Sequence, residues 1–268
     1  MANNIRKDKP ANAWTANELM AYNITISSLK SSDFFPVPDL SLDHVDPSIL
    51  TSPPGDINPA LSDATFQYLS YLALAISNSQ ESFFNDFAAE TLKLLGFNER
   101  YTTVSPHYIM PFCICANNKL IVKADICLLH QQGFVLLVLS EERVLYNGTN
   151  AEEKVIAEVI AAFQNNNEVR WGYSAPTLNA MSIPCIKMSG TRPTFYIVPV
   201  TTELSDAVIT GQYPATPTQV LRCVTVETPF QSLGIGMEDR EYITKTIAAL
   251  QSFQATESSK AAKGLWPF

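Results

Sequence analysis

The chain has 268 residues, of which 46% are hydrophobic and 16% are charged. This balance excludes a disordered chain, because segments that stay unfolded are poor in apolar residues. The formal net charge of −8 argues against a non-specific nucleic-acid binder, which normally carries a basic surface. No apolar run approaches the roughly 20 residues of a membrane-spanning helix, and the N-terminus lacks the apolar core of a signal peptide. We therefore expect an intracellular protein, cytoplasmic or nuclear, that does not enter a membrane.

The N-terminal part of the chain differs in composition from the rest. Seven of the 17 prolines lie in the first sixty residues, among serine, aspartate and asparagine. Proline fixes φ and pushes the preceding residue out of the helical region, so long regular elements are disfavoured here. We expect one helix, over Thr15–Leu29. The sequence predicts an extended arm over residues 1–58 and a single domain over residues 59–268.

Beyond the arm, helical and strand-like patterns follow one another. The predicted strands are 108–116, 120–130, 133–144, 183–188, 194–200 and 220–226. The predicted helices are one that opens within 58–63 and has its apolar positions at 66–76, then 80–95, 151–165, a short helix that begins at 202, and 238–253. This order is typical of an α/β domain in which helices cover a mixed sheet. The run Phe134–Leu139 is apolar at every position, which is typical of a central strand buried on both faces.

Acidic side chains are the pattern in this sequence with the clearest chemical meaning. Phosphate-loop, dinucleotide-binding and nucleophile-elbow motifs do not occur. Asp125 lies on the second predicted strand, and Glu141 follows the apolar run of the third. A hairpin would bring these two carboxylates side by side, and Glu81, at the start of the preceding helix, adds a third acid. Clustered carboxylates suit a Mg²⁺ ion, which can activate water and neutralise the charge of a phosphodiester.

The order of these pieces resembles the PD-(D/E)XK, or restriction-endonuclease-like, nuclease superfamily. The matching pieces are Glu81 with the helix around it, Lys123-Ala-Asp125-Ile, Leu137-Val-Leu-Ser-Glu141-Glu-Arg143 and the helix from Glu152 to Gln164. The likeness covers roughly residues 59–166, under half of the chain, and it is the order of the motifs that carries it. The chain looks like an uncharacterised, fungal-type branch of that superfamily.

The resemblance implies a fold, a reaction and a set of site residues. The fold is restriction-endonuclease-like, with a mixed central sheet flanked by helices. The implied activity is that of a hydrolase, a Mg²⁺- or Mn²⁺-dependent phosphodiesterase (nuclease) that acts on DNA or RNA. Asp125 and Glu141 are the implied metal ligands, and Glu81 is an auxiliary ligand or a residue that orients the others.

The residue at the position of the superfamily's lysine differs from the superfamily's pattern. Arg143 stands there, and an arginine is always protonated, so it cannot accept a proton from water. Lys154, on the following helix, is a candidate for a displaced lysine, and Lys123, two residues before Asp125, is a second candidate. Whether the protein is an enzyme is left open by this substitution.

Three other interpretations stand beside the nuclease, the last of them an enzyme unrelated to phosphodiesters that uses the aromatic surface near Trp171 to hold a small ligand. The first is a non-catalytic interaction or nucleic-acid-binding protein that keeps a nuclease-like scaffold. In the second, Glu141 and Arg143 belong to a solvated turn after a buried strand, and Lys154 is ordinary surface charge at a helix start. The composition is also compatible with a homo-oligomer.

Overall fold

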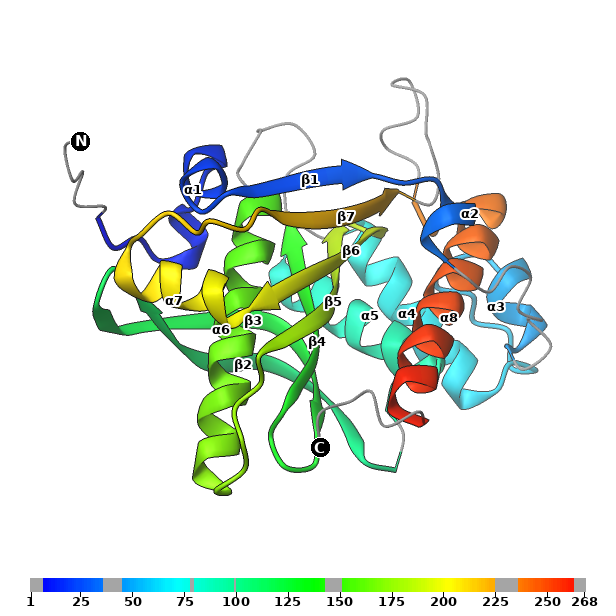
Figure 1. Ribbon diagram of the computed structural model, residues 1–268. Helices are drawn as coiled ribbons and strands as arrows, with labels where there is room; N and C mark the ends of the chain where they lie inside the picture. The colour runs from blue at the N-terminus through cyan, green and yellow to red at the C-terminus, as the bar shows by residue number, and fades with distance from the viewer. Residues whose placement is uncertain are drawn as a thin grey trace.

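The computed structural model describes residues 7–35, 45–77, 80–98, 100–142, 151–224 and 236–262. It has an α/β architecture with a seven-stranded mixed sheet flanked by helices (Figure 1). This confirms the predicted fold class at the level of an α/β domain with a mixed, helix-covered sheet. No helix in the described ranges is long and apolar enough to cross a membrane.

The sheet has the strand order β1-β7-β6-β5-β4-β3-β2. The strands are β1 (Ile24–Ser28), β2 (Thr102–Ile114), β3 (Asn117–His130), β4 (Val135–Glu142), β5 (Ala180–Ser189), β6 (Arg192–Thr201) and β7 (Thr218–Val224). The helices are η1 (Ala11–Ala13), α1 (Ala16–Ala21), α2 (Ser31–Phe34), α3 (Pro47–Thr51), α4 (Asp63–Ser77), α5 (Glu81–Leu94), α6 (Ala151–Gly172), α7 (Thr202–Thr210) and α8 (Arg240–Ala262). The pairs β1–β7 and β4–β5 are parallel, and the other neighbours are antiparallel.

Helices cover both faces of the sheet, as two neighbouring residues of β6 show. Tyr196 donates a hydrogen bond of 2.7 Å to Glu152 of α6, whereas the Phe195 ring lies 5.2 Å from the ring of Phe253 in α8. Successive side chains of a strand point to opposite faces, so α6 and α8 cover opposite faces. Between them, every residue of the run Phe134–Leu139 is at most 5% exposed, which confirms the prediction of a central strand buried on both sides.

Helix α6 is enclosed by its neighbours. Every residue of the stretch Val155–Phe163 is at most 1% exposed, as expected for a helix that is apolar on all sides. The long β2–β3 hairpin crosses α6, and its tip reaches α7 (Figure 1). There the N–H of Cys115 donates to the carbonyl of Val208 over 3.0 Å. The sheet and this hairpin therefore surround α6 together.

Two amide side chains hold the C-terminal half of α6 against neighbouring strands. Gln164 accepts from the N–H and donates to the carbonyl of Cys113 in β2, over 2.9 and 3.1 Å. Asn166 makes the same pair of bonds with Val135 in β4, over 2.7 and 2.9 Å. Each amide satisfies both backbone groups of one residue, as a neighbouring strand would. These bonds fix the rotation of α6 about its axis.

The N-terminal segment is part of the sheet. The prediction of one helix over Thr15–Leu29 is wrong beyond Ala21, where α1 ends. Asn23 takes a left-handed conformation with φ 55°, and the β-branched residues that follow favour the strand β1. Because β1 pairs with β7, this part of the predicted arm is an edge strand. Residues 1–6 and 36–44 of the arm lie outside the described residues.

We predict that Asn166→Ala lowers the free energy of unfolding by about 2–4 kcal/mol, because it leaves the buried N–H and carbonyl of Val135 without partners. Urea unfolding followed by circular dichroism measures the loss. The matched control is Asn165→Ala, since the buried side-chain nitrogen of Asn165 makes no hydrogen bond. Equal losses in the two variants would contradict the role given to Asn166.

Candidate functional site

Strands β3 and β4 separate at Asp125, and the candidate site lies at this separation. The two strands pair from Leu129 to Ile126, while β4 continues alongside β5 as far as Glu142. At the point of separation the Oδ2 atom of Asp125 accepts a hydrogen bond of 2.8 Å from the backbone N–H of Glu141. The carboxylate of Asp125, which is 8% exposed, therefore takes the place of a backbone acceptor.

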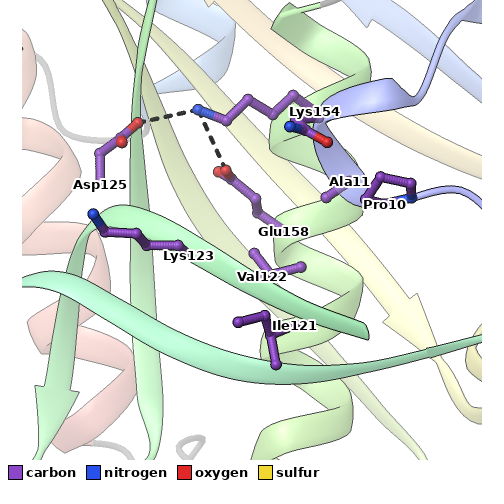
Figure 2. A pocket seen from close by; sticks show the side chains of 9 residues that line it. Pro10, Ala11, Ile121, Val122, Lys123, Asp125, Lys154 and Glu158 are labelled. Carbon is purple, nitrogen blue, oxygen red and sulfur yellow. Dashed lines mark hydrogen bonds and ion pairs between the residues drawn. The ribbon is translucent and has the colours of Figure 1, made fainter. Parts of the chain in front are cut away.

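Lys154, near the start of α6, points toward Asp125. Its Nζ atom lies 3.2 Å from Oδ2 of Asp125 and 3.5 Å from Oε1 of Glu158, one helical turn further along α6. The Oγ atom of Ser140 also donates to Asp125, over 3.5 Å. Figure 2 shows the side chains of Asp125, Lys154 and Glu158 turned toward one another. We refer to these three residues as the charged cluster.

The charged cluster lies in a cavity of about 330 Å³. The cavity is lined by Pro10, Ala11, Asn12, Ile121, Val122, Lys123, Asp125, Lys154 and Glu158. The N-terminal segment supplies one wall, β3 a second and α6 a third. The cavity thus combines two acids and two lysines with apolar side chains.

Burial and charge shift the titration of the cluster. Burial raises the pKa of Glu158 to about 7, the ammonium of Lys154 opposes this rise, and the charge of Asp125 adds to it. For Lys154, burial lowers the pKa, but the attraction of Glu158 and Asp125 outweighs it, so the pKa is raised. Lys154 therefore stays positively charged at neutral pH and does not act as a proton acceptor.

Glu141 reaches the site through its backbone. Glu141 pairs with Met188 of β5. Its neighbour Ser140, which donates to Asp125, points to the face of the sheet that α6 covers. Because successive side chains of a strand point to opposite faces, the side chain of Glu141 leaves the sheet on the face opposite to α6. Burial raises the pKa of Glu141 to about 7, and the charge of Asp125 adds to the rise while Lys154 opposes it. The two predicted acids are thus electrostatically coupled, although their side chains leave the sheet on different sides.

The structure places the other predicted residues as follows. Lys154 is brought into contact with Asp125, and Lys123 lines the same cavity. Glu81 is the first residue of α5, with its side chain outside the described part. Arg143 also lies outside the described residues. Across the described ranges, no three or more His, Cys, Asp or Glu side chains are grouped as a metal site. The roles of all these residues remain predictions.

Glu158 is a residue of the site that is not among the predicted ones. It is 1% exposed and is the one charged residue of the buried stretch Val155–Phe163. Its Oε2 atom has no hydrogen-bond partner. A single carboxylate inside an apolar helix, four residues after Lys154, is the signal that could have found it, since glutamate is seldom fully buried unless it is paired.

Comparisons with known proteins do not assign a function to this chain. No protein-family model matches the chain, and a search of curated protein sequences finds no match. The chemistry of the site is therefore argued from the cluster and its cavity.

We predict that Glu158→Gln changes how stability depends on pH. Because the pKa of Glu158 is raised to about 7 from 4.5, the folded protein binds more protons than the unfolded chain between these values, so its stability falls as the pH rises through them. The neutral glutamine removes this fall and makes the variant more stable than wild type at pH 8 by about 1–3 kcal/mol. Urea unfolding at a series of pH values measures the slope.

The control for this series is Glu241→Gln, which replaces an exposed carboxylate of α8. It should keep the wild-type slope. A Glu158→Gln curve that runs parallel to wild type from pH 5 to 8 would show that Glu158 does not titrate as described.

Proposed function

We propose that this protein is a divalent-metal-dependent phosphodiesterase, a nuclease of DNA or RNA on a restriction-endonuclease-like scaffold. The observation that carries the proposal is the contact of 3.2 Å between Lys154 of α6 and Asp125 of β3, inside a cavity. An acid and a lysine from separate elements meet there, as expected for a displaced lysine. The order of α5, β3, β4 and α6 along the chain agrees with the resemblance.

The carboxylates of the cluster fit a divalent cation. Asp125 and Glu158 line one cavity, and the Oε2 atom of Glu158 is buried without a hydrogen-bond partner. A carboxylate oxygen removed from water without a donor is costly, and a hard cation such as Mg²⁺ or Mn²⁺ binds such oxygens. Asp125 and Glu158 would hold the ion. When bound, it supplies an activated water and neutralises charge on the phosphodiester.

The chain's own residues would contribute position and charge. The ammonium of Lys154 is held by two carboxylates, so its location is fixed before a substrate arrives. Fixed positive charge stabilises the negative charge that develops on phosphate oxygens during displacement, and it does so more strongly in a site that excludes water. Lys154 is therefore proposed as an electrostatic stabiliser and not as a base.

A second candidate function is a non-catalytic protein on the same scaffold. Lys154 contacts both acids, over 3.2 and 3.5 Å, so the cluster is largely neutralised by its own lysine. An arginine at position 143 in place of the superfamily's lysine also favours this alternative.

We predict that the purified protein cleaves DNA or RNA with Mg²⁺ or Mn²⁺, and that Asp125→Asn and Lys154→Met each lower the rate by at least about 100-fold. Asp125→Asn weakens the hold on the metal ion, and Lys154→Met removes the positive charge that stabilises the reacting phosphate. Gel electrophoresis of labelled oligonucleotides measures cleavage, and circular dichroism checks the fold. The control is Lys245→Met, which removes a surface lysine of α8 and should leave the rate unchanged.

Failure of the wild-type protein to cut any nucleic acid under these conditions would reject the phosphodiesterase. Saturable binding of a partner that persists in Asp125→Asn would then favour the non-catalytic alternative. Cleavage that Asp125→Asn retains in full would assign the activity to another part of the molecule.

A further inference from the structure

The reactive groups of the proposed site line the cavity, and its two carboxylates are buried. Asp125 is 8% exposed and Glu158 is 1% exposed, and the Lys154 side chain is 26% exposed. A phosphodiester on the outer surface of the protein therefore does not reach the carboxylates of Asp125 and Glu158. It has to enter the cavity.

The wall formed by Pro10–Asn12 is held in place on both sides. After it in the chain, Trp14 is fully buried and its ring lies 6.2 Å from that of Phe112 in β2. Before it, Lys9 forms an ion pair with Glu18 of α1. Because these anchors flank the wall, the dimensions of the cavity are set by the folded structure.

The size of the cavity excludes a continuous duplex. At about 330 Å³, it lies at the lower end of the roughly 300–1,000 Å³ found for small-molecule sites. A duplex carries its phosphates on the outside of a wide rod with both strands paired, and enzymes that must enclose one nucleotide act on single strands or extrude the nucleotide. A cavity of this size favours one unpaired nucleotide over a paired strand.

The lining has the chemistry of a nucleotide site. Lys123 is an exposed cation of β3 that makes no ion pair with any described residue, and it lines the cavity beside Asp125. An unpaired lysine attracts a phosphate. Asn12 offers an amide that can donate to and accept from a base, and Ile121 and Pro10 provide apolar surface for the sugar and base.

We infer that the substrate enters as an unpaired nucleotide, so that the protein acts on single-stranded nucleic acid and not on intact duplex, with Lys123 and Asn12 as binding residues. This inference rests on the proposed function, whose reactive groups it uses. It adds the class of substrate and names two residues that bind it.

The test compares a labelled single strand with the duplex of the same sequence, as DNA and as RNA, using the full chain. Fluorescence anisotropy without added divalent ion measures binding, and cleavage is measured separately with Mg²⁺. We expect the single strand to bind at least about tenfold more tightly than the duplex and to be the form that is cut. Asn12→Glu should weaken binding of the single strand by about 3- to 10-fold, because the carboxylate cannot donate a hydrogen bond to the base and adds a negative charge to a cavity that receives an anionic strand.

The matched control is Ile57→Glu, which adds the same charge at a site that is 84% exposed and outside the cavity. It should change binding by less than about twofold, the effect of an exposed charge. Duplex bound and cut as well as single strand would overturn the inference and leave the proposed function standing. The inference would also be overturned if the wild-type protein bound no single strand, or if Asn12→Glu left the affinity for the single strand unchanged. Preferential and Asn12-dependent binding without any cleavage would support the inferred ligand and reject the phosphodiesterase.

Discussion

The orientation of α6 about its own axis is the constraint on which both the sheet and the cluster depend. The amides of Gln164 and Asn166 tie the helix to β2 and β4, and close packing around Val155–Phe163 leaves no room to turn. Lys154 and Glu158 lie on the same helix, a few turns away. Since each residue of an α-helix is rotated by a fixed angle from the last, anchoring one end fixes the direction of these two side chains at the other.

The cluster is a costly arrangement for a fold to keep. Two carboxylates and an ammonium are withdrawn from water, and their mutual attraction repays this only in part. Apolar side chains of similar volume at Lys154 and Glu158 would pack α6 against β3 without that cost. Ionisable groups with perturbed titration in a cavity are more typical of functional sites than of structural ones, which supports a chemical role for the cluster.

Local patterns were sufficient to predict the main elements. The apolar run of β4 and the helical spacing of apolar residues in α6 carry their own signals, and Asp125 and Lys154 are distinguished by their charge. The face on which Glu141 lies could not be predicted, because a shift of one residue in register reverses every side chain of a strand. The partners of Glu158 could not be predicted, because a helical pattern does not show which strands enclose the helix. Strand β1 was missed because its partner is far away in the sequence, and no local pattern reports such a pairing.

The parallel pairing of β1 with β7 has a consequence for how the protein is made. Ser28 and Arg222, partners across these strands, are 194 residues apart in the chain. At a synthesis rate of about 5–20 residues per second, β1 waits on the order of 10–40 s for its neighbour to emerge from the ribosome. Contacts between such distant residues also slow folding in general. During that interval Ile24 and Ile26 have no sheet to join, so β1 takes its place only after β7 has been made.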